Sequence, residues 1–242
     1  MLKRLLSVFI TISFASTLTA QDTLSSADPR KDLVDTAVLV YHQFTDKQSR
    51  LYNGTEHIYY HPALEGCPYF LDRDMHTGSL VYDGVYFANV PMQYDCVKDY
   101  LVILHFDRFF KMNLVAEKVK EFSFAGHTYI RMVKDSVNNL PFSTGFYDRL
   151  YNGNLILLAK RTKRIEETVT DKVVQRVSEK TFYYLYNGKN FESVKSYKSL
   201  LAMLKDHSKE VRQYLRKNKI KYRKDRELAI TKAVAYYDSL KN

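Results

Sequence analysis

The sequence predicts an α+β protein, in which an antiparallel, hairpin-rich sheet is followed by a helical C-terminal segment. Three observations support this prediction. Asn-Gly and Asp-Gly turns recur between aromatic and apolar runs, several of these runs alternate in polarity, and apolar residues after about Ser196 recur at helical spacing. Because strands come first and helices last, the expected sheet is a meander, with strong curvature as one option.

The turns carry the clearest signal. Leu-Tyr-Asn-Gly occurs at residues 51–54, 150–153 and 185–188, and Val-Tyr-Asp-Gly occurs at 81–84. A type I′ turn needs positive φ at both central residues, which Asn-Gly and Asp-Gly tolerate. Four of the eight glycines therefore indicate hairpin tips.

The segments around these turns are expected to be strands. Residues 127–132 alternate in polarity, and residues 100–106 are apolar on both faces, as in a central strand. Residues 32–44 are ambiguous, and a helix is favoured there. The predicted strands and hairpins are 79–90, 100–106, 110–114, 127–132, 145–160 and 181–194.

Three helices are expected in the C-terminal segment. Residues 197–207 carry leucines at helical spacing, Ser208 is expected to cap a second helix, and residues 224–240 form the third. Long Gly/Pro/Ser linkers are absent. We therefore expect one domain over 21–242, mainly β over 21–195 and basic and helical over 196–242. A separate C-terminal domain is the alternative.

Residues 1–20 are typical of a signal peptide. Lys3 and Arg4 precede an uncharged apolar stretch, and Ala20 is a small residue suited to cleavage before Gln21. The alternative is an N-terminal membrane anchor, but the run is shorter than the roughly 20 apolar residues that span a bilayer. The sequence thus predicts an exported protein, periplasmic or secreted, without a transmembrane span in the mature chain.

The two cysteines, Cys67 and Cys96, lie in the part predicted to be exported. An oxidising compartment permits a disulfide between them, and two buried free thiols are an equally open interpretation. Neither cysteine belongs to a C-x-x-C pair, so zinc is not indicated.

Charge is segregated along the chain. Residues 21–159 contain 13 basic and 17 acidic residues, whereas residues 160–242 contain 22 and 10. Removing Lys3 and Arg4 lowers the net charge from +10 to +8. The basic stretch predicts contact with an anionic envelope component, a lipid head group or a glycan, while a solvated helical face is the alternative. The candidate contacts are Arg212, Arg216, Lys217, Lys219, Lys221 and Arg223.

Catalytic and metal-binding patterns are weak. His57 and His61 would lie roughly 13 Å apart on an extended strand, too far to share an ion. Asp72, Asp74 and His76 follow, and we interpret this region as a polar, aromatic surface without a metal. The sequence has no nucleophile elbow and no phosphate-binding or dinucleotide-binding glycine motif, so no cofactor is predicted. Asp83, Asp95 and Asp99 could pair in space, as hydrolysis of a polymer would need.

Several segments resemble uncharacterised exported proteins of the Bacteroidota cell envelope. They are Arg-Leu-Tyr-Asn-Gly at 50–54, residues 78–86 continuing through 90–95, and the ending at 215–220 through 236–238. The resemblance implies export and an envelope location, and it implies no activity and no site residues.

The function expected from the sequence is therefore non-catalytic: an exported binding or accessory protein of the envelope. Its partner would be an anionic envelope component or another envelope protein, and export argues against nucleic acid. Two alternatives remain open, a hydrolase of envelope polymers and a carrier that holds an apolar ligand in a curved sheet.

Overall fold

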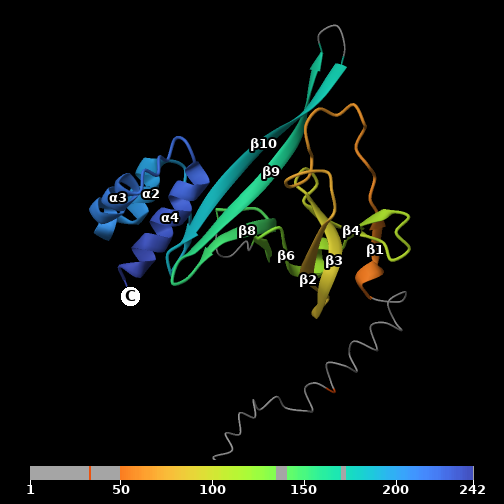
Figure 1. The fold of residues 1–242 in the computed structure, drawn as a ribbon, viewed down its shortest axis with the longest axis horizontal. Helices are drawn as coiled ribbons and strands as arrows, with labels where there is room; N and C mark the ends of the chain where they lie inside the picture. Colours follow the sequence, from red (N-terminus) through yellow and green to blue (C-terminus); the bar gives the residue numbers. More distant parts are fainter. Residues whose placement is uncertain (1–32, 34–49, 135–140, 170–172, 242) are drawn as a thin grey trace, which may run out of the picture. The chain divides into compact units, whose positions relative to one another are not determined.

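The computed structural model describes Leu33 and residues 50–134, 141–169 and 173–241, and it confirms the predicted fold class. In these residues, eleven strands form one open sheet whose neighbours are all antiparallel, and helices follow at the C-terminus (Figure 1). The strands are β1 (Gly54–Glu56), β2 (His76–Tyr82), β3 (Val85–Asp95), β4 (Tyr100–Leu104), β5 (Lys111–Leu114), β6 (Val119–Phe124), β7 (His127–Met132), β8 (Gly145–Asn152), β9 (Ile156–Val169), β10 (Val173–Tyr186) and β11 (Phe191–Ser193). The helices are the α-helices α2 (Tyr197–Met203), α3 (Ser208–Lys217) and α4 (Arg226–Ser239) and the 3-10 helices η2 (Arg50–Tyr52), η3 (Ala116–Lys118) and η4 (Lys205–His207).

Two meanders make up the sheet, whose strand order is β1-β5-β4-β3-β2-β6-β7-β8-β9-β10-β11. The first meander consists of β2, β3, β4 and β5, each paired with the next, and β1 pairs with β5 at its edge. The chain then returns through η3, and β6 pairs with the free side of β2 before the second meander runs to β11. The predicted meander is thus confirmed, with one return crossing between its halves.

Three of the four glycine turns connect adjacent antiparallel strands, as predicted. Asp83 and Gly84, between β2 and β3, have φ of 51° and 79°, as a type I′ turn requires. The turn at 150–153 leads from β8 to β9, and the one at 185–188 leads from β10 to β11. The prediction for residues 51–54 was wrong. Asn53 N–H donates to the Arg50 carbonyl, which closes a 3-10 turn, and the chain enters edge strand β1 instead of a hairpin.

The longest strands are β9 and β10. The prediction covered β9 only up to residue 160 and β10 only from residue 181 onward. Each has 14 residues, and the two pair along their whole length as the long ribbon in Figure 1. Residues 161–169 carry charged side chains on both faces of the strand, such as Lys163 and Arg164. Their sequence therefore does not show the alternation of apolar and polar residues that predicts a strand. The favoured helix at 32–44 lies outside the described residues, apart from Leu33.

Aromatic rings fill the core of the first meander. Tyr94, Phe122 and Tyr129 are at most 1% exposed, and the ring of Tyr129 lies 4.8 Å from each of the other two. Burial of one such ring contributes about 1.5–3 kcal/mol. Because these rings pack against one another, their side chains fill this part of the core.

The C-terminal helices cover one face of β9 and β10. Leu157 and Ala159 of β9 pack with Leu200 of α2 and Val234 of α4 in one buried cluster. Leu158 points to the opposite face and packs with Tyr147 and other residues in a separate cluster. No helix in the described residues is long and apolar enough to cross a membrane.

The helix ends follow simple capping rules, with one correction. Ser196 and Ser199 form a capping box at the start of α2, and Asp225 accepts a hydrogen bond from the Leu228 N–H at the start of α4. Ser208 was predicted to cap α3, but it is the first residue of that helix. His207 occupies the cap position, and its side chain makes no capping hydrogen bond. Ser208 follows η4 directly and has helical φ and ψ of −63° and −28°, whereas a cap residue has non-helical angles.

Candidate functional site

A pocket of about 700 Å³ opens between α2, α3 and the connection from α3 to α4. Its lining combines basic side chains with apolar and aromatic ones, and we call the apolar and aromatic part the floor. We call the whole cavity the basic pocket; its lining residues are Tyr197, Lys198, Leu201, Arg212, Leu215, Arg216, Lys219, Ile220, Lys221 and Tyr222.

Helix α3 places two arginines on the same side of the pocket. Arg212 and Arg216 are separated by four residues, which sets their side chains one above the other on a helix. Val211 and Leu215 are buried on the neighbouring face. The amphipathic pattern of α3 therefore fixes which face is basic.

The end of α3 brings Lys219 to the same pocket. Ile220 N–H donates to the Leu215 carbonyl at 2.9 Å, and Lys219 N–H donates to the Arg216 carbonyl at 3.0 Å. These two bonds form a Schellman motif, in which the residue at the turn has positive φ and is usually glycine. Here it is Lys219, with φ of 57°. The motif reverses the chain so that Ile220 joins Leu215 in the floor.

Two tyrosines close the floor on the side of α2. The rings of Tyr197 and Tyr222 lie 5.3 Å apart, and the Arg226 Nε donates to the Tyr222 hydroxyl at 3.0 Å. Arg226 also donates to the carbonyl of Val194, so it ties this edge of the pocket to the chain that follows β11. The floor is thus held by contacts outside the pocket.

The charge of the pocket is uncompensated. No carboxylate belongs to its lining. Within the described part of the chain, none of its five cations forms an ion pair with a carboxylate. All five cations are exposed to solvent, and an anion placed among them would lower their mutual repulsion. The five are Lys198, Arg212, Arg216, Lys219 and Lys221.

Four of the six cations predicted from the sequence lie in this pocket. Lys217, one position away on α3, instead lines a neighbouring groove with Tyr214 and Tyr236. Arg223 is exposed and belongs to the lining of neither. Sequence reasoning missed Lys198 and the apolar floor, because α2 meets α3 only in the tertiary structure.

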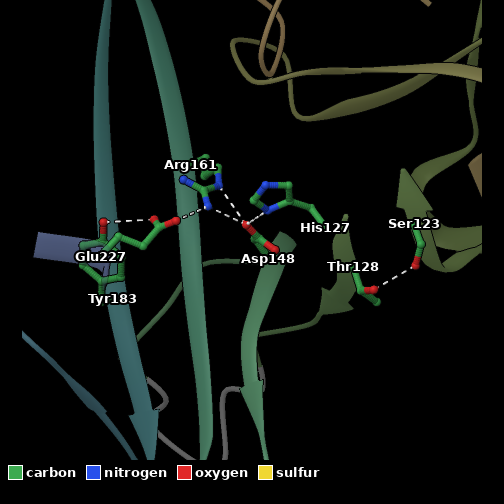
Figure 2. Close-up of polar contacts among 7 residues, drawn as sticks. All are labelled: Ser123, His127, Thr128, Asp148, Arg161, Tyr183 and Glu227. Carbon is green, nitrogen blue, oxygen red and sulfur yellow. Dashed lines mark hydrogen bonds and ion pairs between the residues drawn. The ribbon is translucent and has the colours of Figure 1, made fainter. Parts of the chain in front are cut away.

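A second polar cluster links the sheet to α4. Figure 2 shows its chain of contacts: the Tyr183 hydroxyl donates to Glu227 at 3.1 Å, and Arg161 donates to Glu227 at 2.8 Å. Arg161 Nε also donates to Asp148 at 2.9 Å, and the same oxygen of Asp148 lies 2.7 Å from His127 Nδ1. We call this set the sheet–helix network.

Arg161 is the centre of the sheet–helix network. Burial disfavours its charged form, but hydrogen bonds and ion pairs with Glu227 and Asp148 outweigh burial and raise the pKa of Arg161 above its usual range. Burial, followed by the charge of Glu227, likewise raises the pKa of Tyr183. Arg161 therefore stays charged, and Tyr183 stays a neutral hydrogen-bond donor.

The network contains the His–Asp half of a nucleophilic triad but not its third member. The described residues provide no hydroxyl or thiol with a hydrogen bond to His127. The nearby hydroxyls of Ser123 and Thr128 bond to each other at 2.9 Å instead. Asp148 is shared with Arg161, which binds Glu227 as well and so braces β8 and β9 against α4.

The three carboxylates considered for hydrolysis are each occupied by local contacts. Asp83 lies in the β2–β3 turn near Lys118, while Asp95 lies at the far end of β3 and accepts from the Tyr60 hydroxyl. Asp99 accepts from Lys160 at 2.7 Å and from the Tyr94 hydroxyl at 2.6 Å. Asp83 and Asp95 are separated by the length of β3, so they do not form a pair.

The histidines and acids between positions 57 and 76 have separate partners. His57 is buried, with Nδ1 2.7 Å from Asn113 Oδ1 and Nε2 2.8 Å from the Tyr69 hydroxyl. Burial lowers the pKa of His57 below its ordinary 6.5, although the Asn113 bond opposes this. His76 contacts Asp72 at 2.9 Å, and the His61 ring accepts the Ala63 N–H. In the described residues, no group of three potential ligands could hold a metal ion.

Cys67 and Cys96 are free thiols on adjacent stretches of backbone. Cys96 N–H donates to the Pro68 carbonyl at 3.1 Å, one residue from Cys67. Burial raises the pKa of the Cys96 thiol to about 12, so it stays protonated and is a poor nucleophile. The sequence left a disulfide and two buried free thiols equally open; the structure has no bond between the two sulfurs, and only Cys96 is buried.

Comparisons of this chain with protein-family models, with curated proteins and with solved structures gave no match.

Proposed function

We propose that this protein is an exported, non-catalytic binding protein of the cell envelope that holds an anionic amphiphile in the basic pocket. One observation carries the proposal: five cations, which have no carboxylate partner among the described residues, line a pocket of about 700 Å³ together with apolar side chains. The cations suit a phosphate or carboxylate head, and Leu201, Leu215 and Ile220 suit an alkyl chain. Export rests on the N-terminal sequence.

The apolar floor favours an amphiphile over a free sugar acid. A glycan would meet the cations, but it would leave the aliphatic floor of the pocket without a complementary group. A bare solvated face would need no such floor. The two plausible sources of the ligand, a phospholipid and a free fatty-acid-like molecule, share the same chemistry of one anionic head and one apolar chain.

Calorimetric titration of the mature chain tests the proposal. Dodecyl phosphate, laurate and dihexanoyl phosphatidic acid are the ligands, and they separate the two sources. Dodecyl maltoside supplies a tail without charge, while inorganic phosphate and an oligogalacturonate supply charge without a tail. Saturable binding of the anionic amphiphiles alone is the expected result. Failure of all three to bind, or equal binding of dodecyl maltoside, would refute the proposal.

Variants locate the binding. Arg212→Gln with Arg216→Gln should weaken dodecyl phosphate binding at least about tenfold, because hydrogen bonds to charged groups contribute about 1.5–3 kcal/mol. Lys217→Gln with Arg223→Gln is the matched control, since it removes the same charge from the same segment outside the pocket. Equal losses in both double variants would indicate a diffuse charge effect and contradict a defined site.

A further inference from the structure

The buried imidazole of His57 connects separate parts of the chain. His57 follows edge strand β1, and its backbone N–H donates to the Lys111 carbonyl of β5 at 2.8 Å. Its ring lies between Asn113 Oδ1 of β5, 2.7 Å from Nδ1, and the Tyr69 hydroxyl, 2.8 Å from Nε2. The residue is 1% exposed, so protein groups and not bulk water satisfy both ring nitrogens.

The tyrosine that contacts this imidazole belongs to residues 64–70, which we call the strap. Near one end of the strap, Glu65 forms a bridge with Arg176 of β10. Near the other end, Phe70 N–H donates to the Tyr94 carbonyl of β3 at 2.8 Å. The strap therefore joins two strands that lie far apart in the strand order of the sheet.

The Asn113 amide shows where the proton of the neutral ring lies. Its Nδ2 donates to two acceptors, the Thr55 hydroxyl and the Glu56 carbonyl, each at 3.5 Å. Its Oδ1 therefore accepts from Nδ1–H of His57, and Nε2 is left as the acceptor of the Tyr69 O–H. A proton added to Nε2 makes that atom a donor, so the present hydrogen bond from the tyrosine is lost.

Burial is the largest influence on the charge of His57, and it disfavours the protonated form. The Asn113 bond and the charge of Asp95 oppose burial, whereas the charges of Lys98 and Lys111 act in the same direction as burial. The net effect is a pKa of His57 below its ordinary 6.5. As the pH falls below 6.5, the unfolded chain binds this proton first, so the folded state loses stability.

Three tyrosine rings also face the imidazole. The centroids of Tyr59, Tyr60 and Tyr69 lie 5.8, 6.4 and 5.7 Å from that of His57. Burial raises the pKa of Tyr60 above its usual range and the pKa of Tyr69 to about 12. Tyr60 and Tyr69 are therefore neutral in the pH range in which histidine titrates.

We propose that His57 is a pH-sensitive switch, which holds the strap against β5 through Tyr69 while it is neutral and loosens the strap when acid protonates Nε2. This inference goes beyond the proposed function, because it concerns a conformational change at the sheet and no ligand of the basic pocket.

The pH dependence of stability gives the first test. Denaturant unfolding of the parent chain, His57→Gln and His61→Gln is compared between about pH 7.5 and about pH 5. Below pH 6.5, the ratio of folded to unfolded parent chain should fall relative to that of His57→Gln, by up to about tenfold per pH unit. His61→Gln is the matched control and should follow the parent, because His61 is exposed. Parallel curves for the parent and His57→Gln would overturn the proposal.

A measurement on the parent chain does not depend on the folding of any variant. The ring signals of His57 are followed by NMR during an acid titration of the folded protein. We expect the midpoint to lie below 6.5, and a midpoint at or above 6.5 would overturn the proposal.

Cys96 reports on the strap itself. Its N–H donates to the Pro68 carbonyl at 3.1 Å, and it is 4% exposed. In a Cys67→Ser background, the rate of its reaction with dithiodipyridine is measured with and without His57→Gln at each pH. Dividing the two rates removes the pH dependence of the thiol. The quotient of the rates without and with His57→Gln should rise below pH 6.5 by up to about tenfold per pH unit. A constant quotient, or a rate explained by global unfolding alone, would overturn the proposal.

Tyr69→Phe tests the hydrogen bond, because it removes only the hydroxyl that binds Nε2 of His57. It should raise the rate of Cys96 reaction at about pH 7.5 by about two- to tenfold, as the loss of one hydrogen bond predicts. An unchanged rate would show that this contact does not hold the strap.

Discussion

Lys219 combines an unfavourable backbone conformation with a position in the basic pocket. A residue other than glycine in the left-handed region costs about 1–2 kcal/mol. Its φ of 57° is nevertheless imposed by the Schellman motif that ends α3. The backbone strain and the charge of this position can therefore be tested separately by substitution.

We expect Lys219→Gly to stabilise the protein and weaken ligand binding. Relief of strain of about 1–2 kcal/mol, less the larger entropy of glycine in the unfolded chain, should raise the free energy of unfolding by about 0.5–1 kcal/mol. Denaturant unfolding and titration with dodecyl phosphate measure the two effects.

Lys219→Gln separates charge from strain, because it removes the cation and leaves a side chain in the left-handed region. It should weaken binding without stabilising the fold. A Lys219→Gly variant that bound as tightly as the parent chain would show that this lysine takes no part in the site.

At the scale of elements, the sheet–helix network joins the sheet to the helices that form the pocket. Arg161 of β9 reaches both Asp148 of β8 and Glu227 of α4 (Figure 2). Asp148 is only 1% exposed, so loss of Arg161 would leave a buried carboxylate with His127 as its remaining side-chain partner. The turn between β8 and β9 adds another link, since Asn154 N–H donates to Asp238 of α4 at 3.0 Å.

Arg161→Met should lower the free energy of unfolding by about 3 kcal/mol or more, the usual cost of breaking a buried ion pair on one side. Arg176→Met is the control, because Arg176 pairs with Glu65 at the surface, where the two side chains are 71% and 50% exposed. That pair should contribute at most about 1 kcal/mol. Chemical denaturation compares the two, and equal losses would contradict the assignment of Arg161 as a brace.

For the molecule as a whole, charge follows architecture. The segment from 160 onward, which contains most of β9 together with β10, β11 and the α-helices α2 to α4, has an excess of 12 basic residues, and the preceding segment from Gln21 has an excess of 4 acidic ones. The basic pocket lies in the positive segment.

Export is tested at the same scale by the mature N-terminus. If the chain is produced in a bacterium with its own first residues, N-terminal sequencing of the protein outside the cytoplasm should begin at or near Gln21. Recovery of protein that still begins with Met1, held in the membrane fraction, would instead favour the N-terminal anchor.

Much of the architecture was predictable because its causes are local. Positive φ at Asp83-Gly84 depends on two adjacent residues, and the alternation of residues 127–132 matches β7 (His127–Met132). The 3-10 turn at Arg50–Tyr52 was not predictable from the same turn motif. Which structure such a motif adopts depends on whether a partner strand follows, and here β1 pairs with the distant β5.

The sequence alone determined the fold class, most hairpin positions, the basic character of the C-terminal segment and four of the five cations of the pocket. These features depend on residue types and on spacing along the chain. Only the tertiary structure decided that Lys198 joins them, that Lys217 and Arg223 do not, and that an apolar floor lies beneath. The physical reason is that α2 packs against α3 and so places Lys198 in the same pocket as Arg212 and Arg216. The spacing of these residues along the chain does not indicate that they share a pocket.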